Sequence, residues 1–272
     1  MTANLLGTSV GDILGEVFDA EPGELFVVNP SADAIESVVD AATEFDGALP
    51  ETRLLADDRL LKDVMGDFLV ASNTADLIES GALALRTSDD LSRSSLLVTD
   101  DRVVALVTAG EQTAGLVTDD EAFVPVAGDA VRADWEAAEE YTLRTPAISR
   151  VRQTLDDEIG ADVEADFTDV LASLETARGD GDGLDEVTVS LLVAAKNRVL
   201  LYDISKWGED VGIASKATFS RTKTKLEDVG LIDTEKVPID VGRPRLRLKL
   251  ADDRLQDAPP SELASVAQTV LS

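Results

Sequence analysis

Half of the positive charges of this acidic chain lie in less than a quarter of its length. Residues 187–250 contain 12 of the 24 lysines and arginines, including seven of the eight lysines, but only 8 of the 54 aspartates and glutamates. This segment has a net charge of +4, whereas the rest of the chain has a net charge of −34. A unit that stays basic in so acidic a background points to an anionic partner, and double-stranded DNA is the expected one.

The pattern of this segment predicts three helices followed by two strands. The helices are expected over residues 185–197, 200–209 and 215–230. Ser215 is a good N-cap for the third helix, and Gly230 suits the left-handed residue that follows a helix. The strands are expected over residues 232–237 and 246–250. This order is that of a winged helix-turn-helix, whose third helix enters the major groove.

The third helix has two different sides. On a helix that turns about 100° per residue, the side that should pack on the first two helices carries Phe219, Thr222, Leu226 and Val229. The other side is small, hydrogen-bonding and basic, which suits base edges and phosphates. We predict that it contacts DNA through Lys216, Ala217, Ser220, Arg221, Lys223, Thr224 and Lys225. The alternative is an ordinary solvated helix, but its outer face should carry carboxylates, and residues 215–226 contain none.

The second strand alternates basic and apolar residues. Arg245, Arg247 and Lys249 alternate with leucines, so one face should be basic and the other should face the core. Arg243 lies in a Gly-Arg-Pro segment typical of arginines that enter a narrow minor groove. We therefore add Arg243, Arg245 and Arg247 to the predicted DNA contacts. The alternative is an edge strand whose charges only prevent aggregation.

The first half of the chain alternates short apolar runs with amphipathic stretches, which predicts an α/β domain over residues 1–145. Helices are expected over residues 8–19, 33–43, 59–80 with a break near Ser72, and 129–143. Strands are expected over residues 25–28, 53–56, 82–86, 96–99, 103–107, 113–117 and 122–126.

Three parts should follow this domain. Residues 146–183 are expected to form a helical connector, broken at Gly160, that ends in a flexible Gly/Asp linker over residues 179–183. Residues 184–250 form the winged helix-turn-helix, and residues 251–272 form a C-terminal amphipathic helix. The predicted fold class is an α/β N-terminal domain, a helical linker and a C-terminal winged helix-turn-helix.

The absence of cysteine and histidine excludes several kinds of chemistry. The chain cannot form thiolate or imidazole metal sites, a Ser-His-Asp triad, a cysteine nucleophile or a disulfide. No carboxylate spacing points to general acid–base catalysis. We therefore expect no enzyme, no metal and no cofactor. No apolar run approaches the roughly 20 residues of a membrane helix, and no signal-peptide pattern is present, so we expect a cytoplasmic location without a membrane partner.

The formal charge of −30, with 34 aspartates against 20 glutamates, suggests adaptation to concentrated intracellular salt. Salt screens the self-repulsion of such a chain, with a Debye length of about 3 Å at 1 M. The alternative, a polyanion mimic or cation-binding surface, should gather its carboxylates in one place, and here they are spread along the chain. Since salt weakens phosphate contacts, contacts to bases and groove shape should carry a large share of specific binding.

On its third helix, its Gly-Arg-Pro-Arg segment and the acidic α/β domain before them, the chain resembles the haloarchaeal TrmB-suppressor (TbsP) transcription regulators. The resemblance implies a DNA-binding regulator that acts with the sugar-responsive TrmB on promoters of central carbon metabolism genes, gluconeogenic ones in particular. The N-terminal domain is similar to the phospholipase-D-like sensor layer of TrmB-type regulators. Catalytic members of that fold need a histidine nucleophile, so this domain should be non-catalytic.

The N-terminal domain is a candidate sensor. Asn29 and Ser31 precede a helix whose free N–H groups attract anions, and Arg53 would supplement this ligand site. The alternative is that Ser31 only caps the helix and that Arg53 pairs with carboxylates.

A homodimer is expected because most helix-turn-helix proteins bind two half-sites. Candidate surfaces are the helices over residues 151–174 and 261–271, each of which could instead pack on its own protomer. Two other functions stay open. One is an enzyme or small-molecule-binding protein whose winged domain contacts proteins, and the other is a chromatin protein that binds evenly over the genome.

Overall fold

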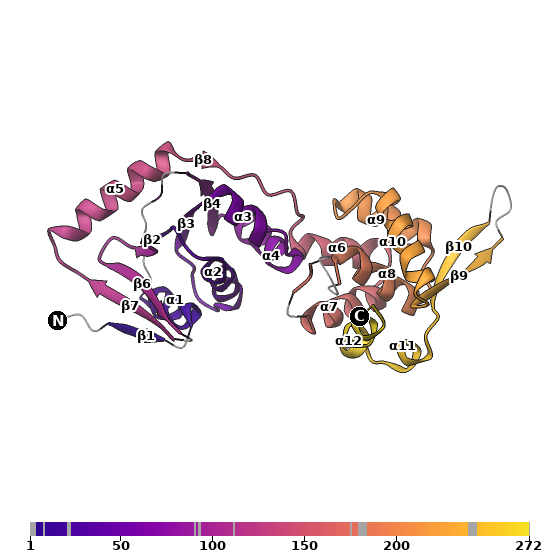
Figure 1. The fold of residues 1–272 in the computed structure, drawn as a ribbon. Coiled ribbons are helices and arrows are strands. Elements are labelled where there is room, and N and C mark those ends of the chain that lie inside the picture. Colours follow the sequence, from indigo (N-terminus) through magenta and orange to yellow (C-terminus); the bar gives the residue numbers. More distant parts are fainter. Residues whose placement is uncertain are drawn as a thin grey trace. The chain divides into compact units, whose positions relative to one another are not determined.

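The computed structural model describes residues 4–7, 9–20, 23–89, 91, 94–110, 112–174, 176–178, 184–238 and 244–271. The chain divides into two compact units (Figure 1). Unit 1 comprises residues 1–66 and 73–143, and unit 2 comprises residues 67–72 and 144–272. No helix in the described ranges is long and apolar enough to cross a membrane.

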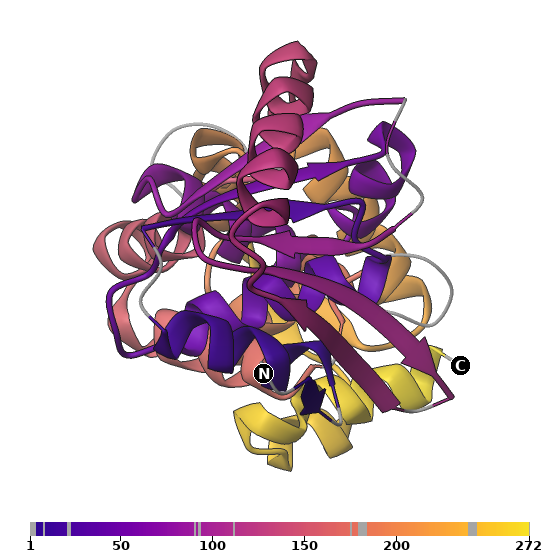
Figure 2. The ribbon, with the colours of Figure 1, turned by 90° about the vertical axis from the view of Figure 1, so that its left-hand side faces the viewer.

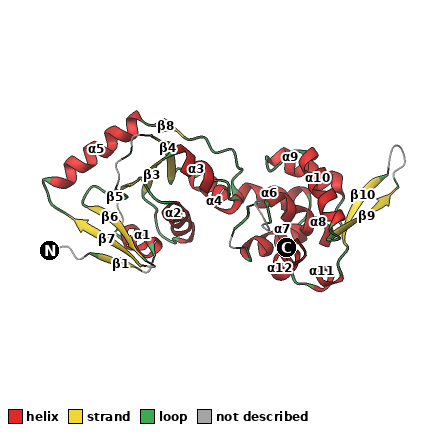
Figure 3. Ribbon diagram, in the orientation of Figure 1, coloured by secondary structure: helices red, strands yellow, loops and turns green. Residues whose placement is uncertain are grey.

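Unit 1 is built on a mixed sheet that has eight strands within the described residues (Figure 3). The order across the sheet is β1 (Leu5–Gly7), β7 (Gln112–Thr118), β6 (Val103–Ala109), β5 (Leu96–Val98), β2 (Glu24–Val28), β3 (Glu51–Ala56), β4 (Leu83–Thr87) and β8 (Glu139–Glu140). Strands β2, β3 and β4 are parallel, whereas the other pairs are antiparallel. The predicted α/β architecture of this half is confirmed.

Helices pack on both faces of this sheet. They are α1 (Val10–Asp19), α2 (Ala32–Glu44), α3 (Asp58–Val64), α5 (Phe123–Ala137) and α4 (Phe68–Glu79), of which residues 68–72 belong to unit 2. Several begin where a side chain caps the first free N–H groups: Ser9 and Asp12 form a capping box on α1, Ser31 caps α2, and Asp57 caps α3. Trp135 of α5 packs with Phe26 of β2 in one apolar cluster, which places α5 on one face of β2.

Three sequence predictions for unit 1 are wrong. The helix predicted over residues 129–143 ends at Ala137, and residues 139–140 form β8, which pairs with β4. Residues 122–126 are not a strand, because α5 begins at Phe123. The Asp120 carboxylate accepts hydrogen bonds from the N–H groups of Ala122 and Phe123, at 3.0 and 2.9 Å, and this local cap starts the helix. The break predicted near Ser72 lies instead at residues 65–67, because the Asp67 carboxylate accepts a hydrogen bond from the N–H of Leu69 and begins α4 there.

Unit 2 has the predicted order of three helices and two strands. They are α8 (Glu186–Lys196), α9 (Leu201–Val211), α10 (Lys216–Asp228), β9 (Ile232–Val237) and β10 (Arg245–Leu250). Before them come α6 (Ile148–Glu158) and α7 (Ala161–Ala172), and after them come α11 (Asp253–Asp257) and α12 (Pro260–Leu271). The single C-terminal helix predicted over residues 251–272 is therefore two helices, because the backbone is extended at Ala258. Gly160 separates α6 from α7, as predicted, at a φ of 140° that glycine tolerates best. The predicted linker over residues 179–183 lies outside the described residues.

The helices around the winged domain share its apolar core. Trp207 of α9 packs edge-on against Phe167 of α7 and donates its indole N–H to Thr154 of α6 at 3.0 Å. The Lys196 ammonium of α8 forms an ion pair with Asp166 of α7 at 2.8 Å. Helix α12 packs on α7. The apolar residues of α6, α7 and α12 that were candidates for a dimer surface are therefore buried within their own protomer: Val151, Leu155, Val163, Phe167, Val170, Leu171, Leu263 and Ala267.

Candidate nucleic-acid interface

The turn between α9 and α10 depends on two glycines. Gly212 ends α9 in the left-handed region, at a φ of 98°, where a side chain would be strained. Gly208, one turn earlier, lies against the ring of Phe219, and a Cβ atom at this position would come within 2.4 Å of that ring. The Ser215 hydroxyl then caps α10 by accepting the N–H of Thr218 at 3.2 Å. These contacts fix how α10 crosses α9.

The buried side of α10 matches its prediction in part. Phe219 and Leu226 are buried in the core of unit 2. Val229 is 44% exposed, so the prediction that it packs inward is wrong. Val229 is the C-cap of α10, one turn beyond Leu226, and it lies past the part of the helix that packs on the core.

The outward side of α10 gathers six of the seven predicted contact residues. The exposed set is Lys216, Ala217, Ser220, Arg221, Thr224 and Lys225. The Arg221 guanidinium is held only loosely, with a 3.4 Å hydrogen bond to the Thr218 hydroxyl. The Thr224 hydroxyl donates to the carbonyl of Ser220 at 3.1 Å, which leaves its oxygen lone pairs on the surface. This face offers donors and small side chains, the chemistry that a major groove requires.

Two lysines of α10 are bound by carboxylates. The Lys223 side chain is only 12% exposed, because Lys223 borders the buried side of α10. It lies one helical turn before Glu227 and forms an ion pair with that carboxylate at 2.6 Å. It does not lie on the outward flank where we expected it. Lys216 is exposed but pairs with Glu209 of α9 at 2.7 Å. This hydrogen bond raises the pKa of Lys216 and lowers the pKa of Glu209.

The wing, formed by β9 and β10, carries a row of ion pairs between its two strands rather than a purely basic face. We call this row the charge ladder. In the antiparallel register, Arg247 lies opposite Glu235 and Lys249 lies opposite Asp233. The corresponding ion pairs measure 3.5 and 2.7 Å. The Lys249 pair lowers the pKa of Asp233. The prediction of one basic and one apolar face was incomplete, since it considered β10 without the acidic residues that β9 places on the same face.

Arg245, at the start of β10, packs on α9. Its guanidinium lies 4.6 Å from the ring centroid of Tyr202 and 3.5 Å from the carboxylate of Asp203. The side chain is thus oriented by a cation–π contact and a partly exposed ion pair. Arg243, predicted to enter a minor groove, lies outside the described residues.

Three cations of the described winged domain have no carboxylate within ion-pair distance: Arg221, Lys225 and Lys236. Sequence reasoning missed Lys236. It is exposed and shares a face of β9 with Thr234, whose hydroxyl donates to Glu227 of α10 at 3.0 Å. Lys236 therefore projects from the side of the wing that packs on α10. The period-2 spacing of Thr234 and Lys236 was the signal that could have found it.

The structure does not bring the three predicted ligand-binding residues of unit 1 together. Ser31 caps α2 by accepting the N–H of Ala34 at 3.3 Å, and Asn29 adjoins it with a φ of 48°. Arg53 lies opposite Phe26, the middle residue of β2, and pairs with the first residues of β2 and β3, Glu24 at 2.7 Å and Glu51 at 2.8 Å. The capping and ion-pairing alternative describes what these side chains do.

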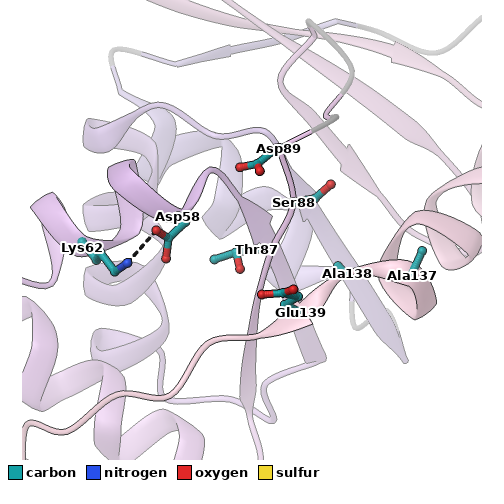
Figure 4. Close-up of a pocket in the computed structure, with 8 residues that line it drawn as sticks. All are labelled: Asp58, Lys62, Thr87, Ser88, Asp89, Ala137, Ala138 and Glu139. Carbon is teal, nitrogen blue, oxygen red and sulfur yellow. Dashed lines mark hydrogen bonds and ion pairs between the residues drawn. The ribbon is translucent and has the colours of Figure 1, made fainter.

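A polar cleft lies elsewhere in unit 1, at the carboxyl ends of β3 and β4 (Figure 4). It has a volume of about 450 Å³ and is lined by Asp58, Lys62, Thr87, Ser88, Asp89, Ala137, Ala138 and Glu139. Lys62 and Asp58 form an ion pair at 2.6 Å. Sequence reasoning did not find this cleft, because its residues come from three separate segments. Among the residues that the structure describes, no group of three potential ligands is arranged to hold a metal ion.

Comparison with solved structures gives a weak likeness. The chain is 17% identical to TrmBL2, described as an archaeal chromatin protein with a novel mode of DNA binding, over 51% of this chain and 53% of that one. The chain thus spans about half the length of this protein, and the TM-score of 0.36 is too low to support an argument. No curated protein matches the chain.

Two family models together cover almost the whole sequence. The model described as "Transcriptional regulator TbsP-like, N-terminal" matches residues 2–146. The model described as "Transcriptional regulator TbsP-like, C-terminal HTH domain" matches residues 147–268, which include α8, α9 and α10. The chain therefore belongs to the family of TbsP-like transcriptional regulators.

Proposed function

We propose that this regulator binds specific promoter sequences with α10 in the major groove. The observation that carries the proposal is the outward face of α10, which is exposed and carries no carboxylate between residues 215 and 226 in a chain of net charge −30. A surface that excludes acidic residues against this background fits a polyanion.

The geometry supports different roles for the residues of this surface. Arg221, free of ion pairs, is suited to bind guanine in a bidentate manner, and Ala217, Ser220 and Thr224 are small enough to lie against base edges. Lys225 and Lys236 are suited to phosphates. Lys216, Lys223, Arg245 and Arg247 must exchange a carboxylate partner for DNA, so we assign them smaller contributions. Arg243 stays a predicted contact.

The Arg221→Ala variant tests this assignment. We expect it to weaken binding to a promoter fragment by about 1–3 kcal/mol and to relax discrimination at one base pair, because a bidentate contact is lost. Arg221→Lys should recover the charge but not the specificity. Fluorescence anisotropy in molar KCl measures both effects. Arg254→Ala, an exposed arginine of α11, is the matched control, and equal affinity of Arg221→Ala and wild type would overturn the assignment.

We further propose the finer biological role that the resemblance implies. The protein would act in the cytoplasm of a halophilic archaeon, as a homodimer and together with TrmB, on promoters of central carbon and gluconeogenic genes. Residues 1–145 would form a non-catalytic, phospholipase-D-like sensor or dimerisation domain, residues 146–183 a connector, and residues 251–272 a closing segment. The boundary between the two family matches, at residues 146 and 147, supports the first of these divisions.

A ligand-sensing role for unit 1 is a second proposal, carried by the polar cleft beside β3 and β4. Clefts at the carboxyl ends of parallel strands commonly bind ligands. The cleft contains the hydroxyls of Thr87 and Ser88 and the charges of Asp58, Asp89 and Lys62. If unit 1 is a sensor, promoter occupancy should change when sugar is added to the cells. Equal occupancy with and without sugar would contradict this role.

A further inference from the structure

One hairpin of unit 1 is almost free of charge. Strands β6 and β7 are the antiparallel partners of this hairpin, and the sequence from residue 103 to residue 118 contains one charged residue, Glu111. Across the whole chain, 29% of the residues are charged. A protein of net charge −30 exposes carboxylates on most of its surface, so an uncharged segment of this length calls for an explanation.

The contacts of Gly115 define the two faces of this hairpin. A Cβ atom on Gly115 would meet Val104 of β6 and Ile13 of α1, so α1 covers that face of the hairpin. Leu116 follows Gly115 and points to the other face, as does Ala105, its partner across the strands. Val107 and Ala114 also lie opposite each other on this second face. We call Ala105, Val107, Ala114 and Leu116 the neutral face.

Helix α5 covers only the neighbouring part of the same side of the sheet. Its residues Val124, Val131 and Trp135 pack in one cluster with Phe26 of β2, Val98 of β5 and Val103, the first residue of β6. Strands β6 and β7 extend past the helix (Figure 2), and no later residue that the structure describes in the hairpin belongs to this cluster. Val107 and Leu116 are consequently each 46% exposed.

The large exposed apolar side chains that the structure describes in unit 1 lie on this hairpin or on α5, the helix that follows it. They are Val107 and Leu116 of the neutral face and Phe123 and Val126 of α5. The last two lie in the first turns of the helix, at 52% and 66% exposure. A single region that combines exposed apolar residues with missing charge is typical of a protein interface.

We propose that the neutral face is the surface on which a second copy of this chain docks. In a twofold symmetric dimer the same patch meets itself, so a patch that carries charges of one sign places like charges opposite each other. A surface rich in carboxylates would repel its copy, whereas the neutral face would not. The inference rests on the proposed function, in which two copies bind two half-sites. It also supplies the dimer surface that α6, α7 and α12 do not, since their apolar residues are buried in their own protomer.

The first test measures the oligomeric state of the full chain in molar KCl by sedimentation equilibrium. We expect wild type to be a dimer. Val107→Asp with Leu116→Asp should weaken the dimer by about 30-fold or more, because four carboxylates then meet at the interface. Val229→Asp is the control, since Val229 is 44% exposed and lies in unit 2. A monomeric wild type, or a double variant that dimerises normally, overturns the proposal.

The second test uses the absence of native cysteine. Leu116→Cys provides a single thiol per chain, and under oxidation by diamide we expect a disulfide-linked dimer that reductant reverses. Val229→Cys should give no such dimer. Because both substitutions are on exposed side chains, circular dichroism should confirm an unchanged fold. Equal cross-linking of the two variants overturns the proposal.

A DNA-binding measurement separates this inference from the proposed function. The double aspartate variant should bind a single half-site as wild type does, but lose affinity for a complete two-site promoter. If wild type dimerises through the neutral face and binds no DNA, the proposed function falls. If wild type binds its promoter and the double aspartate variant dimerises as wild type does, the proposed dimer surface is wrong.

Discussion

At the scale of single residues, the close approach of Gly208 to Phe219 decides how α9 and α10 pack. We predict that Gly208→Ala destabilises unit 2 by about 1–3 kcal/mol, because the added methyl group overlaps the ring and outweighs the gain in helix propensity. Gly15→Ala, a glycine of α1 with no atom near its would-be Cβ, should instead stabilise by up to about 1 kcal/mol. Urea denaturation followed by circular dichroism compares them. A neutral Gly208→Ala would show that α10 shifts freely.

Glu186, in the first turn of α8, makes stability depend on pH. Burial raises the pKa of its carboxyl group, and the nearby carboxylates of Asp185 and Asp67 raise it further. The folded state therefore holds this proton more tightly than the unfolded state, and stability falls as pH rises from the usual value of 4.5 through the folded-state pKa. We predict that Glu186→Gln raises the urea midpoint at pH 7 but not below pH 4.5. An equal gain at both pH values would contradict this cause.

At the scale of elements, α10 and the wing should differ from a uniformly basic surface in their response to salt. Each phosphate contact contributes about 0.9 to the slope of log affinity against log salt. We predict that Lys225→Gln and Lys236→Gln each reduce this slope by about that amount. Lys249→Gln should change it little, since Lys249 already pairs with Asp233. Anisotropy titrations across a series of KCl concentrations measure the slopes. If all three substitutions reduced the slope equally, the prediction that the ion pair with Asp233 keeps Lys249 from a phosphate contact would be wrong.

Helical and strand periodicity predicted the elements of the winged domain well, because its patterns are local. Phe219 and Leu226 could be placed in the core from spacing alone. The pairing of Lys249 with Asp233 could not, because it depends on the register of two strands joined by a turn. The helical start of α5 was missed for a different reason: its apolar residues 122–126 also fit a strand, and the Asp120 cap decides between them.

At the scale of the whole molecule, composition predicted a basic DNA-binding segment over residues 187–250 in an otherwise acidic chain, and the family model for a C-terminal HTH domain covers this segment. The polar cleft and the neutral face could not be predicted, since each is assembled by the order of strands in the sheet. Strand β1, only three residues long, pairs with β7 more than a hundred residues later in the chain. Such pairings arise from packing and leave no local signal.

The most direct test of the central claim, that α10 directs this protein to specific promoters, is chromatin immunoprecipitation across the genome in native cells, where the salt is that of the host. We predict sharp promoter peaks for the tagged wild type that disappear in the Arg221→Ala variant at equal protein level. A flat profile for wild type, or peaks that Arg221→Ala retains, would contradict the account.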